Sequence, residues 1–189
     1  MRAQTPWIEK LHDGSFALQR VLGAVLEAER RFEPPTPPLQ RLQKITTSPE
    51  WEWLQPLYRL IADLDHALAS ADDLPASEAA AIGAHARELL SGTTLLKVRD
   101  GDAAAASQAG AAAARDPRAA ASPEQAFVAH YRALLQADPG VAIAHADALK
   151  ALRVLPAEPA DEAEKQHARQ QWNERRRYLR TGQEGQRAS

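Results

Sequence analysis

The chain has 189 residues, of which 44% are hydrophobic and 25% charged, with a formal net charge of −2 and no cysteine. The missing cysteines exclude a disulfide scaffold, a thiolate metal site and a cysteine nucleophile. No apolar run approaches the roughly 18–20 residues of a membrane span, and residues 1–10 contain no apolar signal-peptide core. We therefore expect a cytoplasmic protein without a membrane segment, and its alanine- and arginine-rich composition looks bacterial.

The composition favours helices over strands. Alanine and leucine, the strongest helix formers, supply 62 residues, whereas valine, isoleucine and threonine supply only 18. No stretch longer than about four residues alternates between polar and apolar side chains, as a half-buried strand would. We predict an all-α fold, an antiparallel bundle of four to six helices.

The first predicted helix begins at Thr5-Pro6, where threonine can cap and proline suits the first helical position. It runs to about Arg31 and ends before the prolines of residues 34–38, which remove backbone donors. A short helical turn is expected over residues 39–45. The apolar stripe of the first helix consists of Trp7, Leu11, Leu18, Val21, Leu22, Val25 and Leu26.

The clearest amphipathic segment follows Ser48-Pro49-Glu50. Its apolar stripe consists of Leu54, Leu57, Tyr58, Ile61, Leu64 and Leu68. Pro56 lies inside this segment, so it either kinks the helix or marks its true start after a separate turn. A further helix is predicted from about Pro75 to Leu90, with Gly92 as a left-handed cap.

Residues 100–122 differ from the rest of the chain. Twelve of these 23 residues are alanine, and none is a large apolar residue. Because such a segment cannot bury enough apolar surface to dock firmly, we predict a flexible linker. Residues 1–99 and 123–155 are then expected to form one bundle, and residues 156–189 a polar, basic C-terminal helix and tail.

Helical signals resume at Ser122, where a serine and Gln125 match a capping box. The stripe of this helix consists of Phe127, Tyr131, Leu134 and Leu135. A break at residues 138–140 precedes a helix over residues 141–154, whose core side is expected to contain Ile143, Leu149 and Leu152. The last helix, residues 161–180, is polar, with Trp172 and Leu179 as apolar anchors, and residues 181–189 are expected to fray.

Histidines are the candidate ligands of a metal or a small molecule. His66, His85, His130 and His145 lie on four separate predicted helices, and neutral imidazole is a common metal ligand. A site built from them would resemble, in general style only, the histidine-rich sites of hemerythrin-like and DinB-like helical proteins. The spacing contains no diagnostic repeat, so partly exposed or core-edge histidines are the favoured interpretation.

Two Glu-x-x-His pairs, Glu9 with His12 and Glu164 with His167, have the spacing used in di-iron bundles. The first pair falls opposite the apolar stripe of its helix, and the second lies in a segment with almost no apolar face. We therefore assign both pairs to the solvated surface.

Aromatic and basic residues are the candidate contact residues. Trp51 and Trp53 are two positions apart, so on one helix they should not share a face. One is expected in the core and the other near the surface, where an exposed tryptophan could bind a partner, but the favoured interpretation is that both pack the helix entry against the connection over residues 34–42. Residues 165–189 carry a local charge of +5, and Trp172 lies near the run Arg175, Arg176 and Arg177.

This C-terminal composition is one that a nucleic-acid contact would use, but the favoured interpretation is a basic helix that packs on an acidic bundle. Nucleic acid is therefore expected as a partner only through that helix.

The sequence contains no nucleophile elbow and no glycine-rich phosphate loop. No catalytic residue and no cofactor are predicted, and a binding protein is favoured over an enzyme. We expect a non-catalytic helical module that binds a protein partner, associates with itself or has a structural role. The alternative is a histidine-lined bundle that binds a metal or small ligand, with or without catalysis.

Overall fold

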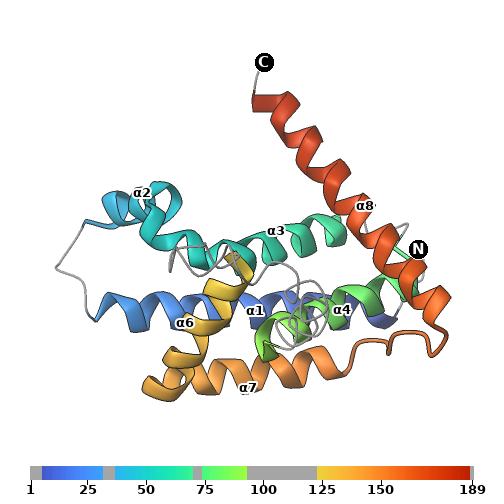
Figure 1. The fold of residues 1–189 in the computed structure, drawn as a ribbon, viewed down its shortest axis with the longest axis horizontal. Coiled ribbons are helices and arrows are strands. Elements are labelled where there is room, and N and C mark those ends of the chain that lie inside the picture. Colours follow the sequence, from blue (N-terminus) through green and yellow to red (C-terminus); the bar gives the residue numbers. More distant parts are fainter. Residues whose placement is uncertain (1–5, 32–36, 70–73, 93–122, 188–189) are drawn as a thin grey trace, which may run out of the picture.

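The computed structural model describes residues 6–31, 37–69, 74–92 and 123–187. Within these ranges the fold is all-α and contains no strand, as predicted (Figure 1). The elements are α1 (Pro6–Arg30), α2 (Pro38–Thr47), the 3₁₀ helix η1 (Pro49–Leu54), α3 (Gln55–Ala69), α4 (Ala76–Ser91), α6 (Pro123–Ala137), α7 (Pro139–Arg153) and α8 (Glu162–Arg187). These seven α-helices exceed the predicted four to six, because the segment expected as a short turn forms the complete helix α2.

Helix α1 lies at the centre of the packing, with α7 on one side and α3 on the other (Figure 1). The helices α1 and α7 run antiparallel, since Arg20 pairs with Asp147 at 2.9 Å while Arg31 pairs with Asp138. Gly14 permits a close approach near the other end, because a Cβ there would lie 3.3 Å from Cδ2 of Leu152. Helix α8 packs mainly on α4, also antiparallel.

The predicted apolar stripes form one hydrophobic core. Its fully buried side chains include Leu11 and Leu18 of α1, Leu57 and Leu64 of α3, and Tyr131 of α6. Burial of such side chains is the main stabilising contribution to a helical bundle.

The prediction for Ile143 was wrong, because its side chain is 62% exposed. The core face of α7 is set by the spacing of Val141, Ala144, Ala148 and Leu152, all buried. At 3.6 residues per turn Ile143 falls on the opposite side of that helix.

The helix boundaries resolve the open question about Pro56. It lies at the second position of α3, where no hydrogen bond is lost, and Pro49–Leu54 forms the separate turn η1. Helix α4 ends at Gly92, whose φ of 71° is the predicted left-handed cap.

Two other predicted boundaries were wrong. Helix α7 begins at Pro139 rather than at residue 141, because the Asp138 side chain caps it by accepting hydrogen bonds from the backbone of Gly140 and Val141. Helix α8 continues to Arg187 instead of fraying from residue 181.

The predicted Ala-rich linker, the caps at Thr5 and Ser122 and the side chain of Leu179 lie outside the described residues. Within the described residues, no helix is both long and apolar enough to cross a membrane.

Candidate functional site

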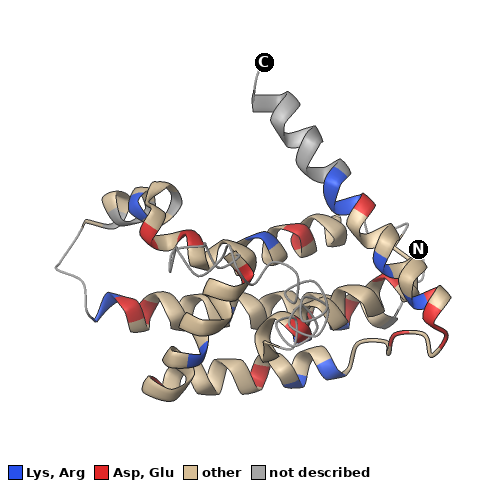
Figure 2. Cartoon of the chain, in the orientation of Figure 1, with Lys and Arg blue, Asp and Glu red and all other residues tan. Residues whose placement is uncertain are grey.

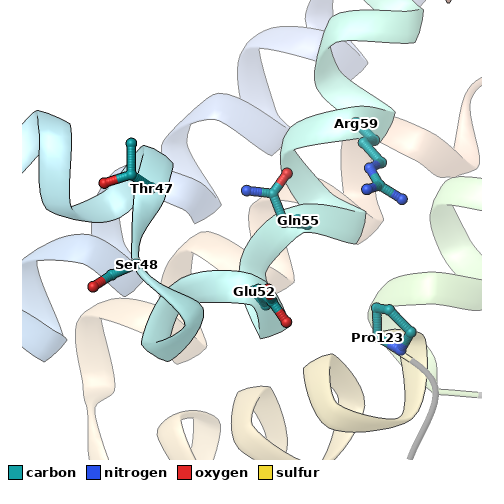
Figure 3. A pocket seen from close by; sticks show the side chains of 6 residues that line it. All are labelled: Thr47, Ser48, Glu52, Gln55, Arg59 and Pro123. Atoms are coloured by element: carbon teal, nitrogen blue, oxygen red, sulfur yellow. The ribbon is translucent and has the colours of Figure 1, made fainter.

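A polar groove of about 370 Å³ lies where η1 and the start of α3 meet the end of α2 and the start of α6 (Figure 3). Figure 3 shows Arg59 and Pro123 at one end of the groove and the two hydroxyl side chains at the other, with Glu52 and Gln55 between them. We call this feature the polar groove. Its lining residues are Thr47, Ser48, Glu52, Gln55, Arg59 and Pro123.

Helical spacing explains how three of these side chains come to line one groove. Glu52, Gln55 and Arg59 are separated by three and four residues, which places them on one face of the continuous segment formed by η1 and α3. Glu52 and Arg59 are exposed, and neither forms an ion pair with another residue of the described chain. The groove therefore offers one negative and one positive group to a ligand.

A stack of aromatic rings supports η1 beside the groove. Trp51 is buried at 4% exposure, and its ring stacks on Trp53 with centroids 6.4 Å apart. Trp53 is partly buried and stacks on Phe127 at 6.2 Å and on His130 at 4.0 Å. Trp51 lies in the core and Trp53 lies nearer the surface, and the two large indole rings nevertheless reach each other. Their contacts hold α6 against η1.

His130 joins this stack to α1. Its Nε2 lies 2.8 Å from Oε1 of Glu29, and its side chain is 44% exposed. The imidazole thus bridges a carboxylate on α1 and the Trp53 ring on η1. His130 therefore links α6, α1 and η1 at the edge of the core.

Tyr131 and His145 form a second polar contact, between α6 and α7. The Tyr131 hydroxyl lies 3.0 Å from Nδ1 of His145. Burial raises the pKa of Tyr131 and lowers the pKa of His145. Both shifts favour the neutral forms, so this pair is an uncharged hydrogen bond inside the bundle.

The charged interface between α8, α4 and α3 contains two nearly buried carboxylates. Arg175 donates from Nε and Nη2 to the two carboxylate oxygens of Glu78, at 2.6 and 3.1 Å. Arg176 donates from Nε to Asp63 at 2.6 Å and also lies over the Trp172 ring, 5.7 Å from its centroid. Glu78 and Asp63 are only 3% and 7% exposed in their side chains.

The outer part of this interface is held by Arg169. It donates from Nε to Glu158 at 2.6 Å and from Nη2 to Glu88 at 2.9 Å. Helix α8 carries residues of both signs in Figure 2, and Arg169, Arg175 and Arg176 face carboxylates of neighbouring segments. This arrangement matches the favoured expectation of a basic helix packed on an acidic bundle.

His85 lies inside the same interface. Burial lowers the pKa of His85 to about 4, and the nearby positive charge of Arg176 acts in the same direction. A small pocket of about 100 Å³ is lined by Ala81, His85, Glu88, Arg169, Trp172 and Asn173. The buried Nε1 of Trp172 has no hydrogen-bond partner within the described chain.

The structure does not bring the four candidate histidines together. His130 contacts Trp53 and Glu29, His145 contacts Tyr131, and His85 lies in the α8 interface. His66 is half-buried on α3. Among the described residues, no group of three or more histidine, aspartate or glutamate side chains could hold a metal ion.

The candidate contact residues also separate. Trp51 and Trp172 are buried, Arg175 and Arg176 are partly buried and paired with carboxylates, and Arg177 is exposed. The two Glu-x-x-His pairs, Glu9 with His12 and Glu164 with His167, are exposed as predicted.

Sequence reasoning missed the buried carboxylates and the groove. Asp63 interrupts the apolar stripe of α3, and Glu78 lies in a run of alanines on α4. An acidic residue in an otherwise apolar face signals a buried charge that needs a partner. The spacing of Glu52, Gln55 and Arg59 could have indicated a polar face beside the predicted proline turn.

Comparison of the chain with protein-family models, with curated proteins and with solved structures finds no match.

Proposed function

We propose that this protein is a non-catalytic helical module that binds another protein, and that the polar groove is its binding face. The pairing of charges is the observation that carries this proposal. The three arginines of the α8 interface each have a carboxylate partner, whereas Glu52 and Arg59 of the groove have none in the described chain. A partner with a basic group for Glu52 and an acidic group for Arg59 can therefore supply the two missing counter-charges.

The size of the groove supports a peptide segment as the ligand. Pockets that hold small ligands measure about 300–1,000 Å³, and the groove, at about 370 Å³, has room for a ligand group of that size. The rings of Trp51 and Trp53 hold η1 in place behind the glutamate, so the lining is carried by a supported element. Preorganised lining reduces the entropy lost on binding.

The positions of the perturbed titratable groups support a role without catalysis. His85, Tyr131 and His145, whose pKa values are displaced, all lie outside the groove. Active sites usually gather such groups in the ligand cleft. The absence of cysteine from the chain is in keeping with our proposal that the module acts in the cytoplasm.

Affinity capture with a charge-swapped groove tests this function. The double variant Glu52→Lys/Arg59→Glu keeps the net charge and reverses both groups of the groove. A matched control, Glu9→Lys/Arg153→Glu, makes the same exchanges at exposed positions of α1 and α7. We expect a protein that is retained by the wild type and the control but lost from the groove variant.

Equal retention by the wild type and the groove variant would contradict the assignment of the binding face. If the wild type enriches no protein over the groove variant in repeated quantitative captures, the proposed function is wrong.

A further inference from the structure

We propose that the groove binds an extended peptide segment with one basic and one acidic side chain four residues apart. The basic side chain would lie toward Glu52 and the acidic one toward Arg59. This inference rests on the proposed function and adds the chemistry of the partner. It follows from the order of charges along the groove and from its neutral lining.

The spacing follows from helix geometry. Glu52 and Arg59 are seven residues apart, on a segment that passes from 3₁₀ to α-helix. With a rise of about 2.0 Å per residue in a 3₁₀ helix and about 1.5 Å in an α-helix, the two positions are separated by roughly 12 Å along the axis. An extended chain advances about 3.3 Å per residue, so four residues, about 13 Å, span that distance, and side chains four positions apart lie on the same face of an extended chain.

The neutral lining suits a peptide backbone. The Gln55 amide provides both donors and an acceptor, and the Ser48 side chain does not cap η1. The Thr47 hydroxyl donates to the carbonyl oxygen of Gln43 at 2.8 Å, which leaves its own oxygen free to accept. An extended segment presents backbone N–H and C=O groups that these side chains can satisfy.

Other ligand classes fit the groove less well. The Glu52 carboxylate would repel a phosphate backbone, which disfavours a nucleic acid. An amphipathic helix needs an apolar groove, whereas this lining consists of five polar residues and one proline. The mixed charge therefore favours a peptide of mixed charge.

Titration of the full-length protein with short peptides tests the proposed charge spacing of the ligand. Blocked heptapeptides with a Lys-Ala-Ala-Ala-Asp or an Asp-Ala-Ala-Ala-Lys core cover both chain directions, and Lys-Ala-Ala-Ala-Lys and Asp-Ala-Ala-Ala-Asp cores are the controls. Amide shifts in ¹H–¹⁵N spectra report binding and its location. We expect one mixed-charge peptide to shift the amides of Ser48, Gln55 and Arg59 and to bind about fivefold more tightly than either control.

Single charge reversals should change the preference in a defined way. Arg59→Glu should move it to the Lys-Ala-Ala-Ala-Lys peptide, and Glu52→Lys to the Asp-Ala-Ala-Ala-Asp peptide. The control Arg153→Glu should leave the wild-type order unchanged, and well-dispersed spectra verify that each variant is folded.

Two results would overturn this inference. One is equal binding of like-charge and mixed-charge peptides by the wild type, and the other is an unchanged preference in both reversed variants. Capture of a protein partner can still depend on the groove when the peptides give either of these results. In that case the proposed charge spacing is wrong, whereas the proposed function stands.

Discussion

At the scale of single residues, the two buried carboxylates Glu78 and Asp63 make the main charged contacts in the interior of the protein. Glu78 receives two hydrogen bonds from Arg175, and Asp63 receives one from Arg176. An unpaired charge inside a protein costs several kcal/mol, so each carboxylate depends on its arginine. Arg175 and Arg176, considered as contact residues from the sequence, are thus engaged within the molecule.

Replacing Arg175 by methionine should destabilise the fold because Glu78 would keep its burial and lose its cation. We expect the free energy of unfolding to fall by about 3 kcal/mol, measured by urea denaturation. Adding Glu78→Gln should recover part of that loss, since a neutral amide costs less to bury. The exposed control Arg153→Met should change the stability by less than about 0.5 kcal/mol. A single variant as stable as the wild type would contradict the prediction.

The imidazole of His85 predicts a loss of stability in acid. Its pKa is lowered to about 4 in the folded state, against about 6.5 in an unfolded chain. Between these pH values the unfolded state binds more protons than the folded state. His85 therefore does not lower the free energy of unfolding above about pH 6.5, and lowers it progressively as the pH falls toward 4. The resulting loss in the free energy of unfolding is up to about 3 kcal/mol.

Denaturation of the wild type and His85→Gln between pH 4 and pH 7 checks this effect. The difference in stability between the two proteins should shift in favour of the variant as the pH falls. His12→Gln, at an exposed position of α1, serves as the control. A difference that is constant with pH would show that His85 does not act in this way.

At the scale of elements, helix ends follow local chemistry that the sequence reveals. Asp138 caps α7, Pro56 sits in the first turn of α3, and Gly92 closes α4 in the left-handed conformation. Each depends on a backbone requirement of one residue type, namely an acceptor at an N-cap, a missing donor or a positive φ. The start of α7 was misplaced because Pro139 and Gly140 resemble a turn, although the Asp138 cap makes them the first helical residues.

The same substitution at two glycines should have opposite effects. Gly23 lies in the exposed interior of α1, with nothing within 4 Å of an added Cβ, so Gly23→Ala should raise the unfolding free energy by about 1 kcal/mol. Gly92 has a φ of 71°, and an added Cβ would lie 2.6 Å from Cγ1 of Val128. Gly92→Ala should therefore destabilise by about 1–2 kcal/mol, from the left-handed conformation alone. Thermal unfolding of both variants checks the signs, and two shifts of the same sign would contradict the argument.

For the molecule as a whole, α8 is an integral part of the bundle. It buries Ala168 and Trp172 and supplies the arginines that neutralise Glu78 and Asp63. Because three of its arginines are already paired, a nucleic acid would have to compete with these internal contacts. The local charge of +5 in the sequence is therefore partly offset by acids far away in the chain.

Removal of residues 165–189 should destabilise the rest of the chain more than Arg175→Met does, because both carboxylates lose their cations and α4 loses its cover. Hydrogen exchange should accelerate in α3 and α4 more than in α6 and α7. A control lacking only residues 188–189 should behave as the wild type. If the shortened chain unfolds at the wild-type urea midpoint, α8 is not an integral part of the bundle.

The amino-acid sequence by itself determined the all-α class, most helix boundaries and the core stripes, since periodicity, capping and proline placement act over a few residues. Tertiary structure alone decided which charges meet, because Arg175 and Glu78 are 97 residues apart and come together only when α8 packs on α4. It also separated the four histidines and left Glu52 and Arg59 facing a shared groove. A local pattern specifies the face of a helix, whereas the packing of helices specifies what that face contacts.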